Sequence, residues 1–173
     1  RVYQEHLSQD GALIDALLMD EDFRDILPAR HLALEGPFSY SQRFTTSSNR
    51  ALATRLRREG SSAMREVIER GGVRRMIQDT PIDSDVFDEI EERMLAVFGT
   101  LSPRQGLRFR SSSNVEDIEG FNGAGLYASY TGFLFPRAQP TLTDQSRSLR
   151  WALKATWASY WAIEAFEERR KIG

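Results

Sequence analysis

The chain has 173 residues, of which 40% are hydrophobic, so it can bury a core, and its length favours a single domain spanning 1–173. Its net charge of -2 argues against a nucleic-acid-binding surface, and the absence of cysteine excludes disulfides, thiolate catalysis and cysteine-ligated zinc. No apolar run reaches the length of a membrane span and no leader opens the chain, so a cytoplasmic protein is expected.

The first hundred residues are expected to be helical. Between about Glu5 and Leu27, apolar residues recur every three or four positions, and Gly11 with the acidic cluster at 20–22 divides this stretch into two short helices. Pro28 limits its continuation. The two histidines lie far apart in sequence, and each is expected to be an ordinary surface or boundary residue rather than a metal ligand; they are His6 and His31.

Three further helices are predicted before residue 100. They cover about 50–59, 63–70 and 85–98, with N-caps expected at 45–49, 61–62 and 83–84, and with glycines at 60, 71–72 and 99 as their ends. Three arginines of the first of these helices predict a solvated face; they are Arg55, Arg57 and Arg58. The short stretch 73–77 is ambiguous.

Two strands and a long helix are predicted in the second half. Leu107–Arg110 alternates apolar and basic residues, so Arg108 and Arg110 share one face, and 125–133 is the partner strand of an antiparallel pair. A helix capped at Thr143 or Asp144 and running to about Lys171 covers 141–172. The predicted class is α+β, mostly helical with a small antiparallel sheet.

The stretch between these strands has the residue types that hold phosphates. Arg110 offers a planar fork of donors at a strand end, and Ser111, Ser112 and Ser113 add hydroxyl and backbone N–H groups. Glycines allow the backbone to approach a ligand closely; they are Gly120, Gly123 and Gly125.

Other interpretations of this stretch stay open. Glu116 and Asp117 can hold the arginines in position or contact magnesium through water. The glycines can equally serve the turn of a hairpin in which Arg110 pairs with one of these acids, because the stretch matches neither GxxxxGK[ST] nor GxGxxG.

Two segments nevertheless resemble a known family. FRSSSNVEDIEGFNGAGLYAS (109–129) resembles the ATP-binding domain shared by phosphoenolpyruvate synthase, pyruvate phosphate dikinase and related water dikinases, and WASYWAIEAFEERRKIG (157–173) is similar to the helix that follows it there. The resemblance implies part of an ATP-grasp domain, in which ATP and Mg²⁺ lie between two subdomains. It also implies phosphoryl transfer from ATP to an enzyme histidine and on to pyruvate or another acceptor.

The resemblance also implies roles for individual residues. Arg110 corresponds to the arginine that contacts the ATP phosphates, and Gly123 to the glycine that approaches the nucleotide. Tyr127 stands where the family has a threonine at the nucleotide, and the spacing from Arg110 to Phe121 is shorter than in phosphoenolpyruvate synthase itself, which indicates a divergent branch.

Several family elements have no counterpart in the sequence. The only lysines, Lys154 and Lys171, do not lie in an N-terminal glycine-rich segment, and the family's metal ligands follow the last helix, after this chain ends. The chain is therefore expected to form about half of an ATP site and to be inactive alone. The alternatives are a non-catalytic nucleotide-sensing or protein-interaction module, and a purely structural helical domain.

Overall fold

The computed structural model describes residues 8–37, 46–102, 105–112, 117–118, 121–123, 125–133 and 147–171. The described residues are mostly helical, with short antiparallel strand pairs, which confirms the predicted α+β class. The chain divides into two compact units: a helical unit of residues 1–79 and 161–173, and a strand unit of residues 80–160. Whether they fold as one domain stays a prediction. Several residues named from the sequence lie outside the described residues: His6, Ser113, Glu116, Gly120, Thr143 and Asp144.

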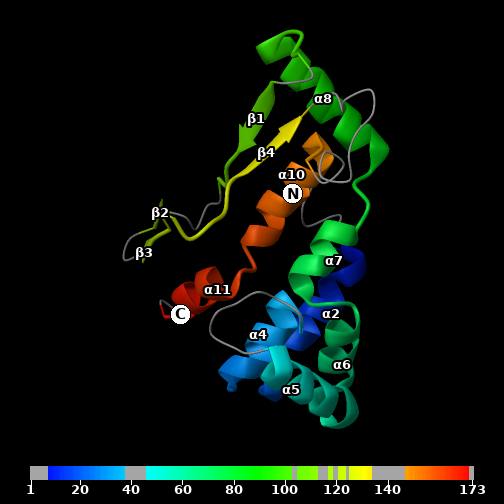
Figure 1. Ribbon diagram of the computed structural model, residues 1–173, viewed down its shortest axis with the longest axis vertical. Helices are drawn as coiled ribbons and strands as arrows, with labels where there is room; N and C mark the ends of the chain where they lie inside the picture. The colour runs from blue at the N-terminus through cyan, green and yellow to red at the C-terminus, as the bar shows by residue number, and fades with distance from the viewer. Residues whose placement is uncertain are drawn as a thin grey trace. The chain divides into compact units, whose positions relative to one another are not determined.

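The helical unit is built from short helices around an apolar core. Its described helices are α2 (Ser8–Leu18), α3 (Glu21–Arg24), α4 (Leu27–Glu35), α5 (Thr46–Glu59), α6 (Ser62–Glu69), α7 (Val73–Asp79) and α11 (Ile163–Arg170) (Figure 1). The largest fully buried apolar side chains come from several of these helices: Leu17, Phe23, Leu32, Leu34, Met64, Ile68 and Ile163.

Short-range signals set several helix ends in this unit. The Ser61 hydroxyl accepts a hydrogen bond from the Met64 N–H at 3.2 Å and caps α6, as predicted. The Asp20 carboxylate accepts from the Asp22 N–H at 2.9 Å and caps α3, so the acidic cluster divides the first helical stretch as predicted, whereas Gly11 lies inside α2 and does not. Pro28 lies in the first turn of α4, where a missing N–H costs nothing. Proline therefore opens a helix that the sequence pattern did not predict.

His31 is not a surface or boundary residue, and that prediction is wrong. Its side chain is 0% exposed, and its Nε2 lies 3.4 Å from Nδ2 of the buried Asn49. Residues 29–34 of α4 are all buried, so this helix has no polar stripe from which its inward face could be read. Asn49 lies in α5, which begins at Thr46, four residues earlier than predicted.

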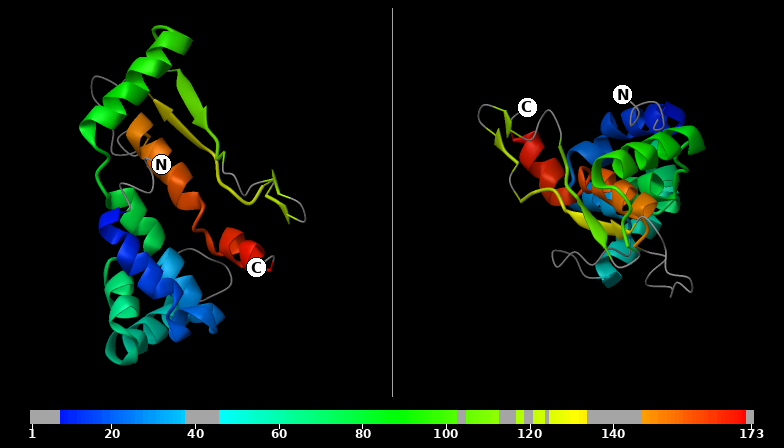
Figure 2. Two further views of the ribbon diagram at one scale, coloured as in Figure 1. Left: turned by 180° about the vertical axis from the view of Figure 1, so that it is seen from behind. Right: turned by 90° about the horizontal axis from the view of Figure 1, so that it is seen from above.

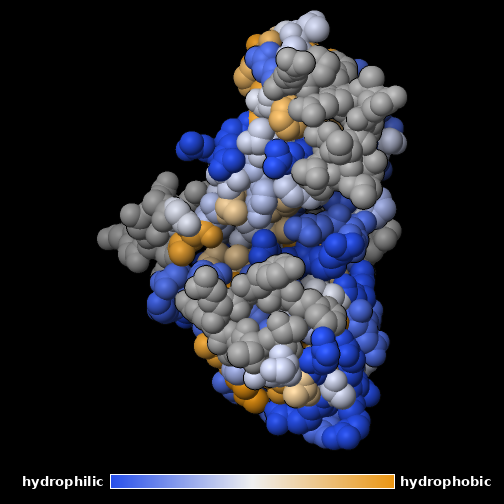
Figure 3. Space-filling model, viewed as in Figure 1, coloured by the Kyte–Doolittle hydropathy of each residue, from blue (hydrophilic) through white to orange (hydrophobic). Residues whose placement is uncertain are grey.

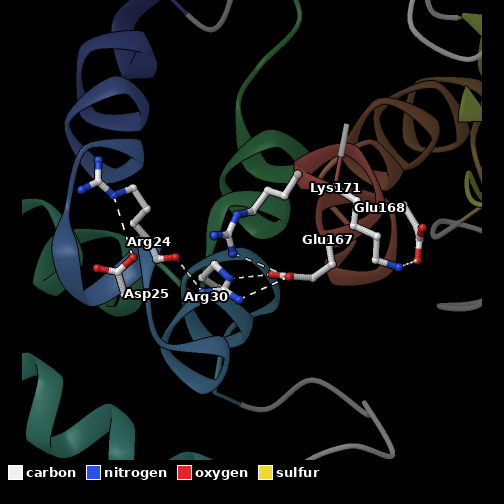
Figure 4. Close-up of polar contacts among 7 residues, drawn as sticks. Arg24, Asp25, Arg30, Glu167, Glu168 and Lys171 are labelled. Atoms are coloured by element: carbon white, nitrogen blue, oxygen red, sulfur yellow. Dashed lines mark hydrogen bonds and ion pairs between the residues drawn. The ribbon is translucent and has the colours of Figure 1, made fainter. Parts of the chain in front are cut away.

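A partly buried ion pair joins α4 to α11 (Figure 4). Arg30 donates from Nε to Glu167 Oε1 at 2.5 Å and from Nη2 to Glu167 Oε2 at 3.2 Å, a two-pronged arrangement that fixes direction as well as charge. Its third nitrogen, Nη1, donates to the backbone oxygen of Arg24 at 2.8 Å. Each guanidinium nitrogen of Arg30 thus has an acceptor, from Glu167 of α11 or from Arg24 of α3.

Glu35 makes a second link between helices of this unit. One carboxylate oxygen accepts from the Ile163 N–H, at the start of α11, at 3.1 Å, and the other accepts from Arg74 Nη1 of α7 at 2.5 Å. The residue at the N-cap of α11, Ala162, has no side chain that can accept a hydrogen bond. Glu35 therefore serves as the cap from a distant part of the chain.

The strand unit contains α8 (Ser84–Phe98), β1 (Gly106–Phe109), β2 (Asp117–Ile118), β3 (Phe121–Asn122), β4 (Tyr130–Phe133) and α10 (Leu149–Ser159). β1 pairs antiparallel with β4, from Gly106 opposite Phe133 to Phe109 opposite Tyr130, which confirms the predicted strand pair. A core of Ile82, Phe87, Leu101 and Leu149 lies beneath this ladder. β4 is shorter than predicted, because 125–129 forms a turn and an irregular segment.

A glycine lets β4 lie directly on α10, and both views show the two side by side (Figures 1 and 2). A Cβ at Gly132 would stand 2.7 Å from the Ala152 Cβ and 2.9 Å from the Leu149 Cα. The Phe133 N–H donates to the Arg147 oxygen at 3.0 Å, just before the Ser148 cap of α10. The start of the helix is thereby fixed to the end of the strand.

The predicted long final helix is two helices, so that prediction is wrong. α10 ends at Ser159, Ala162 is extended at φ -61° and ψ 142°, and α11 starts at Ile163. No glycine or proline marks the break. The break is stabilised instead by Glu35, which takes the N–H that a continuous helix would bond internally.

In the described part of the chain, no helix is both long and apolar enough to cross a membrane.

Candidate functional site

The β1 and β4 ladder fixes the direction of the two arginines predicted at the phosphate stretch. Because side chains alternate along a strand, Leu107 and Phe109 pack toward the core and are half-buried, while Arg108 and Arg110 are exposed. Arg108 lies opposite Thr131, and its Nη1 donates to the Thr131 hydroxyl at 3.3 Å. The predicted alternation of this strand is confirmed.

Arg110 stands directly beyond the last paired residue of β1. Its side chain is exposed, and among the described residues it has no ion pair or hydrogen bond. The next residue, Ser111, is half-buried and Ser112 is exposed. An exposed arginine with hydroxyl groups beside it in the chain can bind an anion through its guanidinium fork.

The glycine segment returns to the same end of the ladder. β2 and β3 form a small hairpin, with Asp117 opposite Asn122, and Gly123 follows it as a buried residue. The Leu126 N–H then donates to the Gly123 oxygen at 3.1 Å, closing a turn in which Gly125 has a φ of 81°. This conformation is one that glycine adopts at little cost.

The strand register places Arg110 and the segment that carries this turn at the same end of the ladder. Arg110 follows Phe109, which pairs with Tyr130, and Tyr130 follows the turn by only a few residues. The structure therefore brings Arg110, Ser111 and Ser112 to the end of the ladder from which the segment carrying Gly123 and Tyr127 enters β4.

Tyr127 is buried at 8% exposure, and its ring stacks on the Tyr160 ring with centroids 5.9 Å apart and planes 5° from parallel. Tyr160 ends α10 and belongs to the second segment on which the family resemblance rests. The sequence did not predict this pairing. The available signal was the aromatic pair at 160–161 just where the helix was assumed to continue.

Both lysines form hydrogen bonds with residues other than those of the candidate site. Lys154 Nζ donates to the Thr80 backbone oxygen at 3.0 Å, and Lys171 Nζ donates to Glu168 Oε1 at 2.5 Å. Within the described ranges no cluster of three histidine or acidic side chains is arranged to hold a metal ion. The described residues of the candidate site include one arginine and two serine hydroxyls, which are groups that can bind an anion.

Comparisons with protein-family models, curated proteins and solved structures found no match for this chain.

Proposed function

We propose that this chain forms part of the ATP site of a dikinase-like phosphotransferase with an ATP-grasp domain, which moves a phosphoryl group from ATP to an enzyme histidine and on to pyruvate or another acceptor. Arg110 clamps the phosphates, Ser111 and Ser112 add donors, and the backbone at Gly123 approaches the nucleotide. The observation that supports this most is Arg110: an exposed, unpaired cation among the described residues, at the ladder end where the glycine segment returns.

The proposed role suits the chemistry. Phosphoryl transfer depends mainly on positioning and on neutralising charge that develops on the phosphate oxygens, and an arginine fork does both. Magnesium bound with the nucleotide would supply further positive charge to the phosphates; among the described residues, no group of three histidine or acidic side chains is arranged to hold it. The residues of this chain then orient the phosphate chain and keep its charge balanced.

The test is Arg110→Ala in the full-length protein that carries this chain. We expect ATP-dependent phosphorylation to fall at least about a hundredfold while the fold is retained, because a charge that stabilises the transferring phosphoryl group is lost. Phosphorylation is followed with labelled ATP, and folding by circular dichroism. Arg110→Lys restores the charge without the fork and should recover only part of the activity.

Arg108→Ala is the matched control. Arg108 is exposed on the same face of the same strand, but its guanidinium is bonded to Thr131. Activity close to wild type is expected for this variant. Equal losses from both substitutions would show a general effect of surface charge. Undiminished turnover in Arg110→Ala would refute the proposed contact of Arg110 with the phosphates.

A second candidate function is a non-catalytic nucleotide-sensing or protein-interaction module. Its protein-interaction form is favoured by apolar side chains exposed at the end of α8, with Val97 at 74% and Phe98 at 56% exposure, where Figure 3 shows orange surface at the top of the view. Calorimetry of ATP binding to the wild-type protein, beside the phosphorylation assay, separates these functions. A sensing module binds ATP without phosphorylating a histidine, and an interaction module does not bind ATP.

A further inference from the structure

We infer that Tyr127 is a positioning residue of the proposed ATP site, and that it acts through its stacking on Tyr160 rather than by touching the nucleotide. The inference rests on the proposed function. Tyr127 and Tyr160 together are called the aromatic clamp. The clamp holds the turn from Gly123 to Leu126 at the ladder end beside Arg110.

The burial of Tyr127 argues against direct contact with a ligand. Only 8% of the residue is exposed, and one face of its ring is covered by the Tyr160 ring, nearly parallel at 5°. A nucleobase that stacked on Tyr127 would need a free ring face. The Tyr127 side chain therefore packs against the protein rather than against a ligand.

Gly125 contributes no side-chain packing to the turn. Gly125 has no side chain, and a Cβ placed on it would meet nothing within 4 Å. The turn is closed by the bond from the Leu126 N–H to the Gly123 oxygen at 3.1 Å. Tyr127 is the next residue along the chain and is buried, so its ring ties the turn to the unit.

The other half of the clamp is held firmly. The Tyr160 N–H donates to the Trp157 oxygen at 3.2 Å at the end of α10. α10 in turn lies against β4 at Gly132, and the Tyr130 and Trp151 rings meet edge to face at 5.3 Å. The turn and the ladder are thus fixed to the same helix, which keeps the Gly123 backbone and Arg110 in register.

The experiment uses the full-length protein with Tyr160→Ala and Tyr160→Phe, so that Tyr127 itself is untouched. ATP affinity is measured by calorimetry, and hydrogen exchange of the Leu126 amide reports whether the turn is held. We expect Tyr160→Ala to weaken ATP binding roughly fivefold and to speed this exchange, because stacking is lost. Tyr160→Phe keeps the ring and should therefore retain more ATP affinity than Tyr160→Ala.

A double-variant cycle adds a measurement that general destabilisation would not reproduce. If the two rings act as one clamp, Tyr127→Ala together with Tyr160→Ala weakens ATP binding no more than either alone. Tyr160→Leu fills the volume without stacking and replaces Tyr160→Ala if that variant does not fold. Additive losses would overturn the clamp.

The outcomes separate the inference from the proposed function. A wild-type protein that does not bind ATP refutes the proposed function, and the inference falls with it. A wild-type protein that binds ATP, with faster Leu126 exchange but unchanged affinity in Tyr160→Ala, refutes the inference alone. Unchanged exchange in Tyr160→Ala likewise overturns the clamp and leaves the proposed ATP site standing.

Discussion

At the scale of single residues, Glu35 of α4 contacts two other helices of its unit, α7 and α11. Its carboxylate holds both the Ile163 N–H and the Arg74 guanidinium, and its side chain is only 10% exposed. We expect Glu35→Ala to lower the free energy of unfolding by about 2–4 kcal/mol, because a partly buried arginine and a helix N–H both lose their acceptor. Urea denaturation followed by circular dichroism measures the change.

Glu89→Ala is the control for this prediction. Glu89 pairs with Arg93 one helical turn away, but the two side chains are 61% and 78% exposed. Removal of this pair should cost less than about 0.5 kcal/mol. Similar costs for both variants would mean that Glu35 is no more than a surface ion-pair partner.

Asp20 gives a prediction about pH. Burial is the main cause that raises the pKa of this carboxyl above 3.8, with repulsion from Asp22 and Glu21 adding to it and backbone hydrogen bonds opposing it. The folded state therefore binds the proton more tightly than the unfolded state, so the carboxyl's contribution to stability is greatest below pH 3.8 and is lost as the pH rises through the raised pKa.

Asp20→Asn tests this sign. Asparagine caps a helix as well as aspartate does but carries no charge. At pH 7 the variant should equal or exceed the wild type in stability, by at most about 0.5 kcal/mol because solvent screens a partly buried carboxyl, and the difference should shrink toward pH 3.5. Urea denaturation at the two pH values is the measurement. If the stability of Asp20→Asn relative to the wild type increased as the pH fell, the predicted direction would be wrong.

At the scale of elements, the contact of β4 with α10 depends on the missing side chain at Gly132. Gly132→Ala places a Cβ within 3.0 Å of the Ser148 oxygen and 2.9 Å of the Leu149 Cα, and backbone atoms do not give way easily. We expect a loss of about 1–3 kcal/mol in the free energy of unfolding. Tryptophan fluorescence reports it, since Trp151 contacts Tyr130 of this strand.

Gly11→Ala is the opposite case. Gly11 lies within α2, and a Cβ there meets nothing within 4 Å. Alanine should stabilise the helix by about 0.5–1 kcal/mol, because glycine gives the unfolded backbone more conformations and folding then costs more entropy. A Gly132→Ala protein as stable as the wild type would mean that the strand and helix separate without cost.

The same elements show what sequence patterns predict and why they fail elsewhere. The Ser61 cap and the alternation of Leu107 and Phe109 depend on neighbours within a few residues, and both were predicted. The break before Ile163 depends on Glu35, which lies 128 positions away, so no local pattern contains it. In the candidate site, the exposure of Arg110 follows from the alternation of side chains along a strand, which a local pattern contains. The stacking partner of Tyr127 is Tyr160 at the end of α10, which a local pattern does not contain.

At the scale of the whole molecule, the division into a helical unit and a strand unit has a measurable consequence. The polar links of Arg30 and Glu35 lie within the helical unit, and the contact at Gly132 lies within the strand unit. If each unit is stabilised by its own core, a substitution in one should raise hydrogen exchange mainly in that unit.

Glu35→Ala and Gly132→Ala form the test of this division. In Glu35→Ala, amide exchange should rise in α4, α7 and α11 and change little in β1, β4 and α10; Gly132→Ala should give the reverse pattern. The double variant should show the sum of the two effects, because sites without shared partners act additively. Hydrogen exchange read by mass spectrometry resolves these segments. A uniform rise across both units in either single variant would show one cooperative structure, in agreement with the single domain predicted from chain length.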